Sequence, residues 1–159
     1  MKIAFIGHRK ISKSQDLKRL LTEIISGLIE NEGAEVFLFG SRSEFDCLCY
    51  DIASDLKNKY EHIRRIYVRA EYEYIDKSYI EYLMSIYDDT VFPDKVKNAH
   101  ALSYIKRNQV MIDECDVLIA YFDENYVPKA RTGSGTRAAV GYALKKKKRV
   151  INIFDLLSR

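Results

Sequence analysis

Residues 3–40 read IAFIGHRKISKSQDLKRLLTEIISGLIENEGAEVFLFG and contain two short apolar runs on either side of one long amphipathic segment. The first run covers Ile3 to Gly7 and the second covers Glu35 to Gly40; both end at a glycine, as buried parallel strands often do. Between them, Ser12 to Gln15 matches a capping box, and leucines and isoleucines then recur on one stripe as far as Gly33. We therefore predict a strand–helix–strand unit.

The same alternation continues through the rest of the chain. We predict further strands at 65–69, 116–122 and 149–153, further helices starting at Ser43 and spanning 78–87, 99–115 and 136–147, and a loop at 88–93. Apolar strands that alternate with helices indicate a parallel sheet covered on both faces. The fold class is therefore α/β, a Rossmann-like three-layer sandwich with a mainly parallel sheet, and we predict one domain over residues 1–159.

Composition excludes several classes of protein. The chain begins with too short an apolar run for a signal peptide and contains no membrane-length apolar run, so we expect a cytoplasmic protein without membrane contact. Cys47, Cys49 and Cys115 have no metal-site spacing and are expected to be reduced thiols. We expect neither a metal nor a cofactor. The net charge of +3 gives no overall polyanion signature, and the basic run Lys145–Arg149 is either a solvated helix end or a contact for nucleic acid or an acidic partner.

The turn Gly133-Ser134-Gly135-Thr136 has the clearest chemical logic. Ligands of open parallel sheets bind outside the carboxyl ends of the strands, and this turn leads from such an end into a helix. Glycines let the backbone approach a phosphate, and the N-terminus of the helix attracts it. Arg137 can add positive charge. The alternative is a tight loop in which Ser134 or Thr136 only caps the helix.

Other residues follow strands at the same predicted edge. Candidate ligand-binding residues there are Gly7, His8, Arg9, Gly40, Ser41 and Glu44, and Arg107 could reach the edge from a helix or face solvent. Glu44 and Glu71 are candidate acid–base groups. For Glu44 the alternative is that a negative charge merely stabilises the start of its helix.

Several of these segments together resemble the SLOG superfamily, which unites the DNA-processing DprA/Smf proteins with the Lonely Guy phosphoribohydrolases. The resemblance rests on the order of the motifs and is closest to the small bacterial members of the superfamily. In chain order, the motifs are the Gly7-His8-Arg9 start, Phe39-Gly40 before Glu44-Phe45-Asp46, Tyr104 to Asn108, Met111-Ile112-Asp113 before Asp116, and Ser134-Gly135-Thr136. It implies a Rossmann-like domain that holds nucleotides or ADP-ribose-type molecules, with phosphate at the Gly-Thr turn. The enzymes of the group have a glutamate after that turn, where this chain has Ala139.

The missing carboxylate favours a domain that binds or senses a phosphorylated nucleoside-type ligand. Two alternatives remain open: an N-glycosidase acting on nucleoside monophosphates, and a DprA-like nucleic-acid-binding module, which the modest net charge disfavours. A homo-oligomer is also compatible with the sequence. The Tyr-rich segment Tyr72–Tyr87 would supply its contact, unless that segment is an ordinary helix packed on the sheet.

Overall fold

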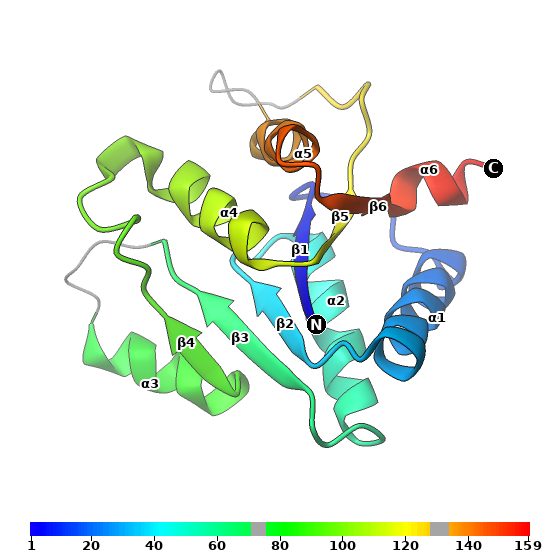
Figure 1. Ribbon diagram of the computed structural model, residues 1–159, viewed down its shortest axis with the longest axis horizontal. Helices are drawn as coiled ribbons and strands as arrows, with labels where there is room; N and C mark the ends of the chain where they lie inside the picture. Colours follow the sequence, from blue (N-terminus) through cyan, green and yellow to red (C-terminus); the bar gives the residue numbers. More distant parts are fainter. Residues whose placement is uncertain (71–75, 128–133) are drawn as a thin grey trace.

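A six-stranded sheet in which all neighbours run parallel forms the centre of the molecule (Figure 1). The computed structural model describes residues 1–70, 76–127 and 134–159. The strands follow the order β4-β3-β2-β1-β5-β6 across the sheet, with bounds β1 Lys2–Gly7, β2 Val36–Phe39, β3 Arg64–Val68, β4 Asp89–Val91, β5 Val117–Tyr121 and β6 Arg149–Asn152. The predicted Rossmann-like α/β class is confirmed.

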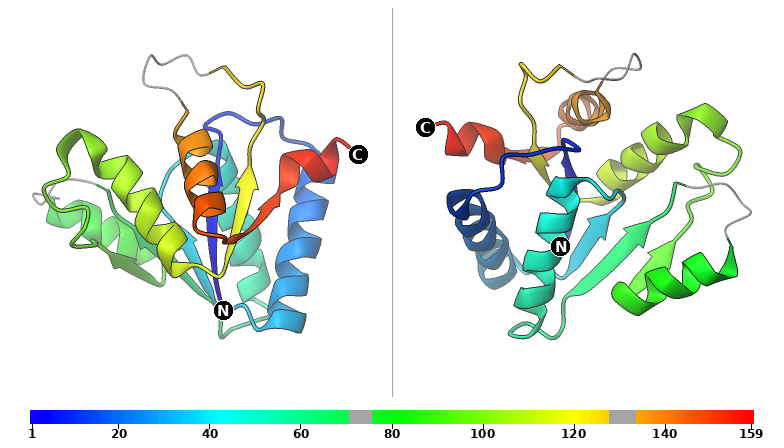
Figure 2. Two further views of the ribbon diagram at one scale, coloured as in Figure 1. Left: turned by 45° about the horizontal axis from the view of Figure 1, so that its top comes forward. Right: turned by 180° about the vertical axis from the view of Figure 1, so that it is seen from behind.

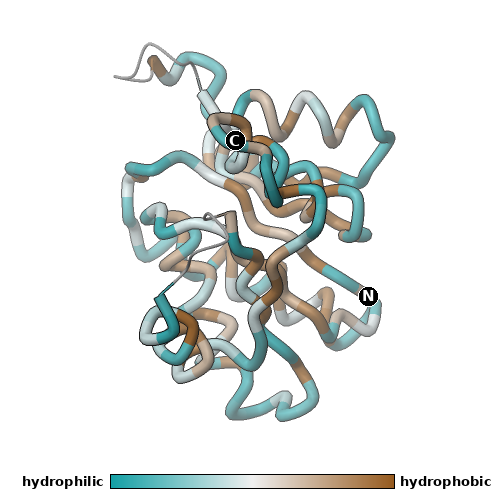
Figure 3. The backbone as a smooth tube through the Cα atoms, turned by 90° about the vertical axis from the view of Figure 1, so that its left-hand side faces the viewer, coloured by the Kyte–Doolittle hydropathy of each residue, from teal (hydrophilic) through white to brown (hydrophobic). Residues whose placement is uncertain are grey.

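Helices cover both faces of the sheet (Figure 2). Their bounds are α1 Gln15–Glu32, α2 Glu44–Lys57, α3 Lys77–Ile86, α4 Ser103–Glu114, α5 Gly135–Lys145 and α6 Ile153–Leu157, with a 3₁₀ turn at His100–Leu102. Buried side chains of α1, α2, α3 and α6 share one apolar cluster with Phe5 and Phe37, whereas α4 and α5 share the other with Ala4 and Leu38. Alternate residues of each strand thus serve opposite layers. In Figure 3, hydrophobic residues accordingly colour the segments that pass through the middle of the molecule.

Three local predictions are corrected. Helix α1 begins later than the Ser12 capping box implied, because the Ser14 side chain accepts a hydrogen bond from the Leu17 N–H, 3.0 Å away, and caps the helix. The predicted loop at 88–93 contains β4, whose three residues pair with Ile66–Val68 of β3. The predicted helix at 99–115 divides into the 3₁₀ turn and α4. In addition, α6 follows the last strand and was not predicted from the sequence.

The predicted contact segment Tyr72–Tyr87 lies partly outside the described residues. In its described part, Tyr87 packs against Tyr50 and Tyr67 at centroid distances of 4.9 and 5.1 Å, whereas Tyr82 is exposed. Helix α3 is thus anchored to the sheet through its C-terminal end. None of the described helices has the length and apolar character needed to cross a membrane.

The order in which strands are added to the sheet reverses at β1. From β1 the strands progress one way to β4, and the chain then returns over the sheet to place β5 on the other side of β1. Such a reversal leaves a crevice at the carboxyl ends of the two strands, because their following loops diverge. The ends of β1 and β5 are therefore the place where a ligand site is expected.

Gly7, the last residue of β1, gives a test of this packing. A Cβ built there would lie 2.4 Å from Cγ and Cδ1 of Phe45, a fully buried side chain of α2. We expect Gly7→Ala to lower the free energy of unfolding by about 1–3 kcal/mol, because α2 must shift. Urea denaturation measures the change.

Gly27→Ala is the matched control. Its Cβ would meet only the Asn31 side chain at 3.9 Å, within α1. Alanine should raise stability there by about 0.5–1 kcal/mol. Equal effects of the two substitutions would show that Phe45 does not constrain the end of β1.

Candidate functional site

The carboxyl edge of the sheet gathers polar residues from five elements. Arg9, Arg42 and Arg69 follow β1, β2 and β3, Arg107 comes from α4, and Arg137 lies in the first turn of α5. Residues far apart in the sequence therefore meet at the end of the sheet where the loops lead into α2 and α5 (Figure 1). We call this end the carboxyl edge.

Gly40 and Arg107 are in direct contact. A Cβ on Gly40 would lie 2.6 Å from Cδ of Arg107 and from Sδ of Met111, so only glycine leaves room for the arginine to cross the end of β2. Arg107 is 4% exposed, and its Nε donates to Oδ1 of Asn108 over 2.8 Å. The structure thus brings together two of the residues predicted from sequence, with the glycine accommodating a protein side chain.

Beside them lies Asp46, a carboxylate that is 3% exposed. Its Oδ2 accepts hydrogen bonds from the backbone N–H of Ser41, at 2.9 Å, and from the Ser41 hydroxyl. Its Oδ1 is buried without any hydrogen-bond partner in the described part of the chain. Burial raises the pKa of Asp46 to about 6, while the Ser41 hydrogen bonds and the charge of Arg107 oppose the rise.

A second buried polar atom without a partner belongs to Arg69. Its Nε has no acceptor among the described residues, and its guanidinium lies 5.5 Å from the centre of the Phe92 ring. The Arg42 guanidinium lies over the rings of Tyr79 and Tyr82, 5.3 and 5.5 Å from their centres. Aromatic rings thus contact both guanidinium groups, and Arg42 also forms a hydrogen bond with Tyr79, whereas Nε of Arg69 is left for another partner.

His8 organises the ends of β1 and β5. It is 3% exposed, its Nε2 accepts the backbone N–H of Asp123 at 2.9 Å, and its ring stacks on Tyr126 at 4.1 Å. Burial lowers the pKa of His8, which keeps the imidazole neutral so that Nε2 can accept. Through these contacts, His8 stabilises the loop that follows β5. A direct contact with ligand stays a prediction, and Arg9 is exposed beside it.

The start of α5 contacts the loop after β5 at the same edge. The Ser134 hydroxyl caps the helix by accepting the Arg137 N–H at 3.2 Å, and a Cβ on Gly135 would meet nothing within 4 Å. Thr136 is buried, and Arg137 donates to the Glu124 carbonyl while its guanidinium lies 5.3 Å from the Phe122 ring centre. Gly133 lies outside the described residues, so the phosphate role of the whole turn stays a prediction.

The predicted acid–base candidates are placed differently. Glu44 pairs with Lys10 at 2.9 Å and accepts the Ile11 N–H at 3.1 Å; the Lys10 hydrogen bond, followed by that of Ile11, lowers its pKa. Glu44 therefore ties the loop after β1 to α2, and a general-acid role for it stays a prediction. Glu71 lies outside the described residues. Ala139 is 4% exposed and packs in the apolar cluster beneath α5.

Sequence reasoning did not single out Asp46, Arg42 or Arg69 as candidate site residues. A signal for the two arginines was present, since Arg42 follows one predicted strand and Arg69 is the last residue of another. Asp46 lies three residues after the helix cap Ser43, a position that reads as helix-end stabilisation. It lies near the charge of Arg107, a residue of α4 that is distant in sequence. Across residues 1–70, 76–127 and 134–159, no three His, Cys, Asp or Glu side chains group to hold a metal ion.

Asp46 predicts an unusual dependence of stability on pH. The folded protein holds its proton more tightly than the unfolded chain does, because the pKa is about 6 rather than 3.8. Ionisation of Asp46 therefore lowers stability as pH rises from about 4, and the loss is complete above pH 6. We expect Asp46→Asn to be more stable than the unsubstituted protein by about 2–3 kcal/mol at pH 8, with the difference vanishing near pH 4.

Thermal and urea unfolding at both pH values measure this difference. Asp51→Asn, on an exposed position of the same helix, serves as control and should change little at either pH. A destabilised Asp46→Asn with an unchanged pH profile would show that the carboxyl is not penalised by burial.

Comparison with known proteins supports the fold and the family. The sequence profile of the YspA SLOG family matches residues 5–156. Among solved structures, the Moco carrier protein from Chlamydomonas reinhardtii is similar with a TM-score of 0.50 and 22% identity, over 96% of this chain and 75% of that one. No curated protein gives a match. The match along nearly the whole sequence shows that the chain belongs to the YspA SLOG family.

Proposed function

We propose that this protein binds a phosphate-bearing nucleoside-type ligand at the carboxyl edge of its sheet. The observation that carries the proposal is the pair of orphaned buried atoms, Oδ1 of Asp46 and Nε of Arg69. Buried polar atoms are nearly always satisfied, and leaving one unpaired costs about 1–3 kcal/mol. A ligand that supplies both partners would recover that cost on binding.

The two atoms need opposite kinds of hydrogen-bond partner. Oδ1 of Asp46, when ionised, requires a hydrogen-bond donor, and Nε of Arg69 requires an acceptor. A ribose phosphate offers both, since its hydroxyl groups donate and its phosphate oxygens accept. An inorganic anion would satisfy only the arginine. The two atoms therefore favour a ligand that carries both a sugar and a phosphate.

The charge of the edge supports the same ligand class. Arg9, Arg42, Arg69, Arg107 and Arg137 all lie there, and guanidinium groups match phosphate oxygens in geometry. The first backbone N–H groups of α5 add a positive dipole end at the crevice. The open space at Gly135 leaves the helix start accessible. The arginines and the start of α5 thus both support binding of a polyanionic group at the carboxyl edge.

A second candidate function is cleavage of the N-glycosidic bond of such a ligand. One observation favours it: Asp46 is a buried carboxyl whose pKa of about 6 suits proton exchange near neutral pH. A carboxylate can also stabilise an oxocarbenium-like transition state. Against it, the position that carries glutamate in the enzymes resembled here is Ala139, in the core beneath α5.

Calorimetric titration with adenosine, AMP, ADP and ADP-ribose tests the proposal. We expect AMP to bind at least tenfold more tightly than adenosine, because only AMP has a phosphate for the arginines. Arg107→Ala should weaken AMP at least tenfold. Arg19→Ala, an exposed arginine on α1, should leave the affinity unchanged. Binding that is equal for adenosine and AMP, or absent for the whole panel, would contradict the proposal.

Chromatography of the same mixtures separates holding from cleaving. Intact AMP after prolonged incubation indicates a binding protein. Release of free base that Asp46→Asn abolishes would instead establish the glycosidase. Because Asp46→Asn is expected to fold stably, its loss of activity would not reflect unfolding.

A further inference from the structure

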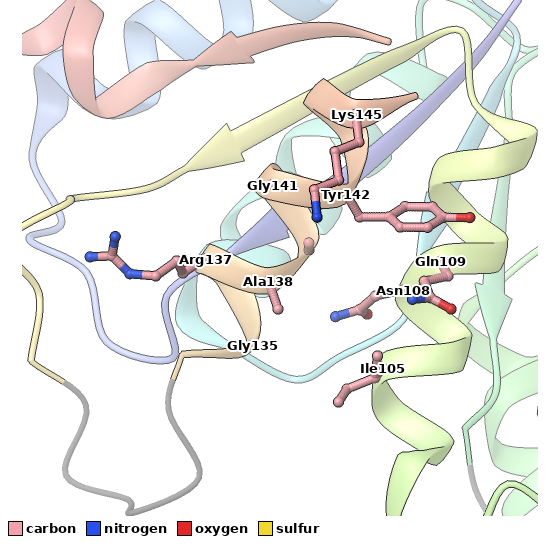
Figure 4. Close-up of a pocket in the computed structure, with 10 residues that line it drawn as sticks. Ile105, Asn108, Gln109, Gly135, Arg137, Ala138, Gly141, Tyr142 and Lys145 are labelled. Atoms are coloured by element: carbon pink, nitrogen blue, oxygen red, sulfur yellow. The ribbon is translucent and has the colours of Figure 1, made fainter. Parts of the chain in front are cut away.

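A groove between α4 and α5 lies beside the carboxyl edge but runs away from it. It encloses about 330 Å³ and is bounded by Ile105 and Asn108 of α4 and by Gly135, Ala138 and Gly141 of α5, which face one another in Figure 4. From Gly135 to Lys145 the helix rises about 15 Å. A second hollow of about 350 Å³ continues it and shares Gln109 and Tyr142. We call the two together the α4–α5 groove.

The floor of the groove is apolar and open. Ala138 is exposed and Ile105 is 43% exposed, although both are apolar. A Cβ built on Gly141 would meet no atom within 4 Å, so the trough between the helices is not filled by the protein's own side chains. Open apolar surface of this kind is typical of a place where another side chain inserts.

The rim of the groove is basic. Its cations are Lys95, Lys106, Lys145 and Lys146, whereas Asp113 is the single acid that lines it within the described residues. The guanidinium of Arg137 points away from α4, toward Glu124 and Phe122 (Figure 4). Asp113 is already engaged, since it lies 3.6 Å from both Lys95 and Lys146 and accepts the Tyr142 hydroxyl at 2.9 Å. Lys106 and Lys145 have no carboxylate within ion-pair distance in the described ranges. The rim thus presents uncompensated positive charge around an apolar floor.

These features choose between three kinds of occupant. A second copy of the chain docked through the same face would bring the same cations and be repelled. Single-stranded nucleic acid requires free aromatic faces for its bases, but Lys146 lies 5.3 Å over the ring of Tyr142, the one aromatic residue among the described lining. An acidic peptide with an apolar side chain matches both the rim and the floor.

We propose that the α4–α5 groove binds an acidic segment of a partner protein, with an apolar side chain between Ile105 and Ala138 and carboxylates against Lys106 and Lys145. The groove begins at Gly135 and Arg137, which also belong to the carboxyl edge. A partner seated there would contact the start of α5, and so would sense whether that edge is occupied. The proposal itself does not require the ligand proposed above.

Phage display of random dodecapeptides on the full chain tests the proposal, with counter-selection on Gly141→Leu. Leucine fills the trough, and it favours the helix over glycine, so the variant should fold. We expect enriched peptides to carry Asp or Glu around one Leu, Ile or Phe. Enrichment of neutral or basic peptides would overturn the proposal. So would a selection in which every enriched peptide also binds the Gly141→Leu variant.

Fluorescence anisotropy of the best peptide then locates the contact. Lys106→Ala with Lys145→Ala should weaken it at least tenfold, whereas Lys13→Ala with Lys18→Ala, near the start of α1, should not. Added salt should weaken binding. A labelled oligo-dT strand that binds more tightly than the peptide and loses affinity in the same double variant would assign the groove to nucleic acid instead. Dimer formation lost in Gly141→Leu would assign it to a second copy.

Discussion

Strand β1 is hydrogen-bonded along both edges and covered on both faces, and this double burial fixes the rest of the molecule. It pairs with β2 on one side and β5 on the other, and its residues Ile3 to Phe5 are fully buried. A strand enclosed in this way must be apolar throughout and can present polar groups only where it ends. The polar chemistry of the protein therefore collects at Gly7 and beyond.

Charged side chains are buried at the carboxyl edge, although burial of charge opposes folding. Asp46 and Arg107 are both almost wholly buried, and burial of charge costs stability unless partners compensate it. The protein supplies part of the compensation through Ser41 and leaves Oδ1 of Asp46 unpaired. An incompletely satisfied buried carboxylate is destabilising, and the ligand proposed above would relieve this cost by supplying the missing partner.

Sequence patterns predicted what depends on local chemistry. Apolar runs and caps located β1, β2, β5 and the long helix α1, because period and capping are properties of neighbouring residues. They missed β4, whose three residues become a strand only by pairing with β3. They also missed Asp46, since its charged neighbour Arg107 comes from a helix about sixty residues away in the sequence. Gly40 and Arg107 were predicted separately; their contact was visible only in the fold.

The same distinction clarifies the relation between the carboxyl edge and the α4–α5 groove. Ala139 packs inward from α5, and Ala138 and Gly141 open outward from the same helix. One face of α5 is thus sealed against the sheet while the next is left hollow. Small residues on the sealed face, Ala139 and Ala143, let α5 lie close to the sheet. Small residues on the next face, Ala138 and Gly141, leave the groove open. The phosphate site proposed at the start of α5 and the groove proposed along its side thus both depend on small side chains of one helix.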